Sequence, residues 1–188
     1  APPLAYLLTA STYVFSTWSI WRISAPEPRP ARTDASLGSQ IAQGLSFVRG
    51  QRILFPLFTC TAFMAFAGAG IQVLLPILVL RTLGMDATQL GLLLSAGAIG
   101  GILGAFTRPA WVARLGVGRC IVITNIGGVT ILLVQPVSIH VPAAAAWIIA
   151  ISAVVSSYFL TVYNVTQISL RQEICPPDML GRMNAIFR

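Results

Sequence analysis

Residues 53–80 read ILFPLFTCTAFMAFAGAGIQVLLPILVL, which is a run of 28 residues without a charged side chain. A helix needs roughly 20 apolar residues to cross the hydrocarbon core of a bilayer, so this run is long enough to span a membrane. At about 1.5 Å per residue the helix would be roughly 42 Å long, which exceeds the thickness of the core. The sequence therefore predicts a spanning helix that tilts, bends or projects from the membrane core, with irregularities at Pro56 and Pro76.

The composition of the whole chain is that of a membrane protein. Hydrophobic residues make up 56% of it and charged residues only 9%, whereas a soluble domain has roughly 25% charged residues. A net charge of +7 would suggest a nucleic-acid partner in a soluble domain, but every basic residue is arginine and no aromatic-rich basic patch is present. We therefore expect a lipid bilayer as the main partner and no nucleic acid.

The charged residues separate five apolar stretches. We expect an all-α fold, a polytopic helical membrane protein with five transmembrane helices. The predicted spans are residues 2–21, 53–79, 88–107, 120–138 and 144–166.

The arginines predict the orientation of these spans. Eleven arginines lie in alternate connections, at residues 22–52, at residues 108–119 and after residue 170, and only Arg81 lies on the other side. The positive-inside rule places the eleven in the cytoplasm, so the chain would start outside. We therefore expect a multi-pass protein of the cell membrane.

The connection at residues 22–52 has two parts. Residues 25–32 contain three prolines and read as an extended linker. Residues 36–49 are periodic, with four apolar residues on one helical stripe. These are Leu37, Ile41, Leu45 and Val48. This pattern predicts a helix along the inner membrane surface, and partner recognition is the alternative role.

The third predicted span carries two overlapping G-x-x-x-G patterns. They are formed by Gly97 with Gly101 and by Gly100 with Gly104. Glycines at this spacing remove side chains from one helix face, so another backbone can approach closely. Close packing is the expected role, and a smooth face that slides during transport is the alternative.

Residues 171–184 read RQEICPPDMLGRMN. This R-Q-x-x-x-P-x-D-x-L-G-R-x-N pattern resembles the loop after the tenth membrane helix of exporters in the major facilitator superfamily, in the branch with enterobactin and macrolide exporters. The resemblance implies a twelve-helix bundle of which this chain carries five helices.

The resemblance also implies a domain organisation. Residues 1–21 would be the last transmembrane helix of the N-terminal half, residues 22–52 the central cytoplasmic loop with its amphipathic helix, and residues 53–188 an incomplete C-terminal half. The remainder of the same polypeptide would then be a partner.

The function implied is secondary-active export of amphipathic small molecules, drug-like or siderophore-like, by alternating access. The resemblance implies a proton antiporter of the bacterial cytoplasmic membrane, the cell inner membrane. The alternative is a transport-inactive membrane scaffold or interaction protein with the same fold.

A second motif of this family resembles G-x-L-a-D-r-x-G-r, a cytoplasmic turn whose charges pair differently in inward-open and outward-open states. The matching positions here are Arg114, Leu115, Gly116 and Arg119, but Ala113 occupies the Asp position. The resemblance predicts gating roles for the two arginines and the glycine. A purely topological role is equally open, and the missing carboxylate raises the scaffold alternative.

In the loop after the last span, the resemblance implies gating roles for Arg171, Asp178 and Arg182. Asp178 could pair with either arginine in one state of the transport cycle. It could instead cap the next short helix, and both readings remain open.

Polar side chains within spans cost free energy unless they meet a partner or water, so they are candidates for substrate binding. We predict this role for Gln72, Tyr158 and Asn164, with Phe63 and Phe66 as an adaptable apolar wall. Contact with lipid or packing between helices is the alternative role for the aromatic pair.

The acidic residues all lie in loops or at the ends of spans. They are Glu27, Asp34, Asp86, Glu173 and Asp178. A proton-coupled carrier needs a group that changes charge during the cycle, so we expect the coupling group elsewhere in the polypeptide.

Catalytic and metal-binding patterns are missing from the sequence. Cys60, Cys120 and Cys175 are too scattered for a CxxC pair, and His140 is the only histidine. No phosphate-binding loop is present either. We therefore expect no enzymatic activity, no metal site and no cofactor.

Overall fold

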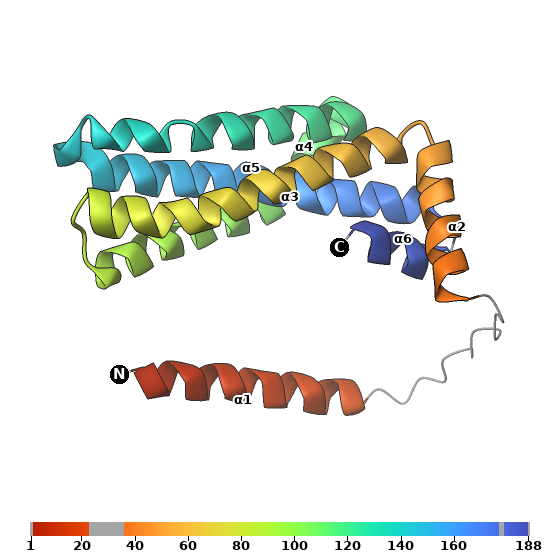
Figure 1. The fold of residues 1–188 in the computed structure, drawn as a ribbon, viewed down its shortest axis with the longest axis horizontal. Coiled ribbons are helices and arrows are strands. Elements are labelled where there is room, and N and C mark those ends of the chain that lie inside the picture. The colour runs from red at the N-terminus through yellow and green to blue at the C-terminus, as the bar shows by residue number, and fades with distance from the viewer. Residues whose placement is uncertain (1, 23–35, 177–178, 188) are drawn as a thin grey trace. The chain divides into compact units, whose positions relative to one another are not determined.

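The computed structural model describes residues 2–22, 36–176 and 179–187, and nearly all of them are helical (Figure 1). No strand occurs within these three ranges, so the predicted all-α class is confirmed. The chain divides into two compact units, Ala1–Ala35 and Ser36–Arg188. The proline-rich linker predicted at 25–32 lies outside the described residues.

The first unit contains helix α1, Pro2–Trp21, at the position of the first predicted span. Several hydroxyl groups in it donate to carbonyl oxygens of the preceding turn, for example Ser11 to Leu8 at 2.7 Å and Thr17 to Tyr13 at 2.9 Å. This bonding reduces the cost of placing hydroxyls in lipid. The many Ser and Thr residues nevertheless lower its hydropathy, and α1 is not among the segments apolar enough to be identified as spans.

The second unit contains three segments that are long and apolar enough to cross a membrane, namely Leu54–Thr82, Ala87–Ile139 and Pro142–Ile174. Its α-helices are α2 (Leu37–Gly50), α3 (Leu54–Ile77), α4 (Ala87–Leu132), α5 (Ala145–Ile174) and α6 (Leu180–Phe187). The short elements are the π-helical η1 (Leu78–Thr82) and the 3-10 helices η2 (Gln135–Ile139) and η3 (Pro142–Ala144). The π-helical turn begins two residues after Pro76, where the sequence predicts an irregularity.

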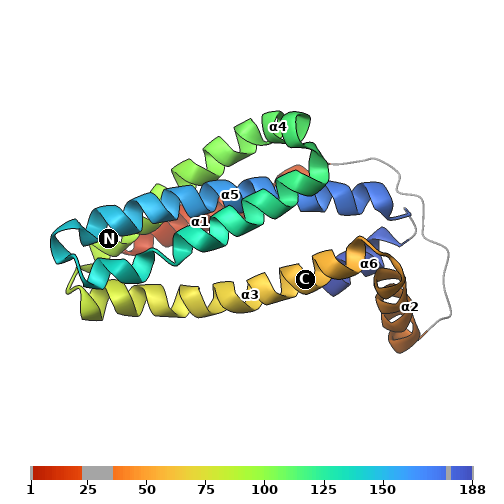
Figure 2. The ribbon, with the colours of Figure 1, turned by 90° about the horizontal axis from the view of Figure 1, so that it is seen from above.

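Helix α4 reverses its direction at Gly116 and so forms two arms, residues 87–115 and residues 117–132 (Figure 2). Gly116 has φ 74° and ψ 162°, a backbone conformation that is essentially restricted to glycine. The two spans predicted at 88–107 and 120–138 correspond to these arms. The helix of the first arm continues beyond its predicted span to residue 115, and one glycine makes the turn.

Both arms pack against α5, and glycines make the contact close. An added Cβ on Gly100 would overlap the carbonyl oxygen of Val154, and one on Gly104 would lie 2.5 Å from the carbonyl oxygen of Tyr158. On the second arm, a Cβ on Gly127 would lie 3.3 Å from the Phe159 ring. The G-x-x-x-G spacing therefore brings helix backbones together, as the sequence predicts.

One end of this unit holds α2, α6, the start of α3, the bend of α4 and the end of α5, and we call it the arginine-rich end (Figure 1). Val48 and Met183 are buried there together with Leu54. A Cβ on Gly44 would lie 2.6 Å from the side chain of Ile186, which shows how closely α2 approaches α6. Elements η1, η2 and η3 lie at the opposite end.

Helix α2 begins after Ser36, whose hydroxyl accepts a hydrogen bond from the Ser39 amide at 3.3 Å. The residues of the apolar stripe predicted on this helix differ in burial. Val48 is fully buried against α3 and α6, whereas Ile41 and Leu45 are 61% and 45% exposed. The exposed pair is compatible with a helix lying on a membrane surface.

The orientation predicted from the arginines can be tested by chemical labelling. Single cysteines replacing Asp86 or His140, in an otherwise cysteine-free protein, should react with an impermeant thiol reagent added outside sealed cells. A cysteine replacing Ser36 should react only after the cells are permeabilised, because the arginine-rich end would face the cytoplasm. Labelling of the Ser36 variant in sealed cells would reverse the orientation.

Candidate functional site

A cavity of about 570 Å³ lies between α3, the second arm of α4 and α5. Its volume is in the range of small-molecule binding sites, roughly 300–1,000 Å³. Six of the lining side chains are polar and none is charged. The polar ones are Gln72, Thr124, Asn125, Ser156, Ser157 and Tyr163. The walls are otherwise made of small and aliphatic residues, including Met64, Gly68 and Leu160.

Three of the polar side chains already have partners in the protein. The Thr124 hydroxyl donates to the carbonyl oxygen of Cys120 at 2.7 Å, and the Ser156 hydroxyl donates to that of Ala153 at 3.2 Å. The Tyr163 hydroxyl lies 3.2 Å from the Thr61 hydroxyl of α3. Hydroxyl groups that bond back to their own helix contribute less to ligand recognition.

The two amides of the cavity differ from these hydroxyls. Asn125 Nδ2 is buried and has no hydrogen-bond partner among the described residues. Gln72 lies on α3 and is exposed. Each amide carries a donor and an acceptor. Gln72 on α3 and Asn125 on α4 could therefore both bind a carbonyl or hydroxyl group of a ligand.

Of the five predicted substrate-binding residues, only Gln72 lines this cavity. Tyr158 is instead part of an aromatic cluster between the first arm of α4 and α5. Its hydroxyl accepts hydrogen bonds from Trp111 Nε1 at 2.7 Å and from the Thr107 hydroxyl at 2.9 Å. The Tyr158 ring also makes an edge contact with Phe159, with 5.4 Å between ring centroids.

Asn164 is half-buried and lies outside the cavity lining. Phe63 and Phe66 are 70% and 82% exposed, whereas their neighbour Met64 lines the cavity. Roles in substrate binding for these residues and for Tyr158 stay predictions.

Asn125 and Tyr163, which line the cavity, are not among the residues predicted from the sequence. A signal for the α3 wall was present, because Ala65, Gly68 and Gln72 recur at the i, i+3, i+7 spacing of one helix face. A comparable signal was present on α5, where Ser156 and Tyr163 are seven residues apart and therefore share one helix face.

The predicted gating residues that the structure describes lie at the arginine-rich end. Gly116 makes the bend of α4, and Arg114 and Arg119 on either side of it are exposed. Arg182 Nη1 donates to Gln43 Oε1 of α2 at 3.1 Å. Arg171 is only 7% exposed.

Asp178, the predicted carboxylate partner of Arg171 or Arg182, lies outside the described residues. Its pairing therefore stays a prediction. Within the described ranges, no group of three or more His, Cys, Asp and Glu side chains could hold a metal ion.

Comparison with known proteins identifies the family. The family description Major Facilitator Superfamily matches residues 2–188. Searches of curated proteins and of solved structures find no significant match. Since the match covers nearly all of the 188 residues, this chain belongs to the Major Facilitator Superfamily, a family of multi-pass membrane transporters.

Proposed function

We propose that this protein is a secondary-active exporter of amphipathic small molecules, and that the cavity between α3, α4 and α5 binds them. The supporting observation is the lining of the cavity, which combines aliphatic walls with two amides on different helices and has no charged side chain. Apolar walls with a few polar groups are typical of ligand sites. Such a lining favours a bulky, neutral body with hydrogen-bonding groups.

The direction and the energy source of transport are part of this proposal. Similarity of residues 171–184 to enterobactin and macrolide exporters supports export of drug-like or siderophore-like molecules from a bacterial cytoplasm. The acidic residues that the structure describes, Asp86 and Glu173, lie near the ends of α4 and α5. We therefore propose that neither of these two residues couples transport to protons.

A transport assay tests the proposal. Everted membrane vesicles that contain the intact protein should accumulate a neutral fluorescent amphipath with saturable kinetics, because export from the cell corresponds to uptake into everted vesicles. A protonophore should abolish the accumulation if protons drive it. Equal accumulation by vesicles with and without the protein would favour the transport-inactive scaffold.

A further inference from the structure

Three polar residues follow one face of α5 from the cavity toward the arginine-rich end. They are Tyr163, Gln167 and Arg171, each four residues after the last, so their side chains lie one above the other. All three are buried, with exposed fractions of 3%, 4% and 7%. Tyr163 lines the cavity, and Arg171 lies two helical turns farther along.

The charge of Arg171 is poorly compensated by the described residues. Its Nε atom is buried and has no hydrogen-bond partner there. The guanidinium carbon lies 4.2 Å from the centre of the Phe187 ring of α6. A cation–π contact offsets part of the desolvation of a guanidinium but does not neutralise it. A buried cation is stable only when an anion or several hydrogen bonds compensate it.

Neither acidic residue that the structure describes compensates Arg171. Asp86 accepts a hydrogen bond from the Gln89 amide at the start of α4, at the opposite end of the unit. Glu173 is exposed, and two residues along a helix correspond to about 200° of rotation, so it lies on another face of α5.

Gln167 supplies a second unsatisfied group on the same face. Its Oε1 atom is buried and has no partner among the described residues. Rotation of the amide by half a turn exchanges this oxygen for an NH₂ donor at nearly the same place. One oxyanion could then accept hydrogen bonds from the Gln167 amide and from Arg171 Nε, one helical turn apart.

We propose that Gln167 and Arg171 form a binding site for an oxyanion, a carboxylate or a phosphate, at the arginine-rich end of α5. This site goes beyond the proposed function, because the cavity itself is lined by uncharged residues. The oxyanion could belong to a soluble amphipathic molecule or to a lipid headgroup, since both offer the same chemistry. A guanidinium is well suited to either group.

Binding of benzoate tests the site without a transport assay. The intact protein, in nanodiscs of zwitterionic phosphatidylcholine, should show a rise in Tm with benzoate concentration at constant ionic strength, because a ligand stabilises the state that binds it. The uncharged analogue benzamide should have no such effect. Arg171→Gln should weaken benzoate binding roughly tenfold to a hundredfold, the usual loss for a hydrogen bond to a charged group.

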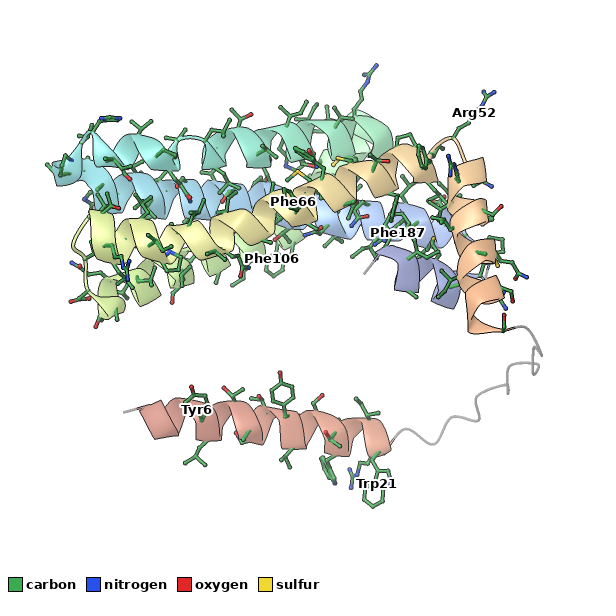
Figure 3. The ribbon with its side chains drawn as sticks, viewed as in Figure 1. Tyr6, Trp21, Arg52, Phe66, Phe106 and Phe187 are labelled. Carbon is green, nitrogen blue, oxygen red and sulfur yellow. The ribbon has the colours of Figure 1, made fainter. Side chains whose placement is uncertain are left out.

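Two further variants control this measurement. Arg52→Gln removes an exposed arginine of the same end and should leave the benzoate effect unchanged (Figure 3). Gln167→Ala keeps the positive charge and should weaken binding less than Arg171→Gln does. It also provides the test if Arg171→Gln does not fold.

Lipid composition distinguishes the two sources of the oxyanion. If the phosphate of an anionic lipid fills the site, added phosphatidylglycerol should raise the Tm of the parent protein but not that of Arg171→Gln, and should weaken benzoate binding. If a soluble molecule fills it, benzoate binding should be independent of phosphatidylglycerol. Either result supports the site.

Three results would overturn the proposal. One is the absence of any effect of both benzoate and phosphatidylglycerol, as expected if Gln167 and Arg171 simply bond to each other. Another is an equal benzoate effect in Arg171→Gln, or in Gln167→Ala where Arg171→Gln does not fold. The third is a benzoate effect seen only in Asp178→Asn, which would show that the chain's own carboxylate occupies the site.

Discussion

Among single Gly→Ala substitutions in α4, Gly100→Ala should destabilise the protein most. The new Cβ would overlap the carbonyl oxygen of Val154 and would lie 2.7 Å from its carbonyl carbon and 3.1 Å from the Tyr158 nitrogen. All three are main-chain atoms of α5, which cannot rotate away. The first arm of α4 must therefore move away from α5, at a cost of about 3 kcal/mol, the upper end for overpacking.

The measurement is the free energy of unfolding of the intact protein in detergent, with Gly101→Ala as the matched control. A Cβ on Gly101 would meet only the Thr161 hydroxyl at 3.4 Å, an ordinary contact. Alanine also favours a helix over glycine by about 1 kcal/mol, so the control should be neutral or slightly stabilising. Equal stabilities of the two variants would contradict the close packing of α4 on α5.

Among substitutions that leave the fold intact, Gly68→Leu should cause the largest loss of transport. Gly68 lines the cavity, and a Cβ there would have no atom within 4 Å, so the larger side chain can enter the open space. The isobutyl group would then take volume that a bulky substrate needs. We expect kcat/KM for such a substrate to fall roughly tenfold to a hundredfold, which corresponds to a few kcal/mol of overpacking.

Gly70→Leu is the matched control, because it places the same side chain two residues farther along α3. A Cβ on Gly70 also has no atom within 4 Å, but Gly70 does not line the cavity. Both variants should be expressed and extracted equally, since leucine favours a helix over glycine. Equal transport by Gly68→Leu and Gly70→Leu would show that the substrate binds elsewhere, even if the protein is an exporter.

Much of this architecture could be predicted because the order of apolar and charged residues shows which segments can cross a membrane. A helix across the hydrocarbon core must satisfy its own backbone and carry few charges, so its position follows from the spacing of the arginines. The helices at 2–21, 54–77 and 145–174 were found in this way, with α5 longer than predicted because helices can extend beyond the membrane core. The pattern at 171–184 indicated the family that the comparison then identified.

The reversal of α4 was harder to predict for a local reason. The sequence has several glycines and Pro109 around the turn, and any of them could end a helix. Only the conformation of the chain shows that Pro109 lies inside the first arm and that, within α4, Gly116 is the residue with a non-helical, positive φ. The choice depends on how both arms can pack against α5 at once.

The candidate sites show most clearly what the sequence by itself determined and what the tertiary structure decided. The sequence determined that Tyr158, Asn125 and Arg171 are polar residues in or next to apolar helices. Placing such a side chain in a membrane costs free energy, so each of them is a candidate for a functional role. Tertiary structure decided their surroundings: Tyr158 bonds to Trp111, Asn125 lines a cavity, and Arg171 is buried beside Phe187. The physical reason is that the free-energy cost of burying a polar group depends on its neighbours. In a helical bundle those neighbours come from segments distant in the sequence.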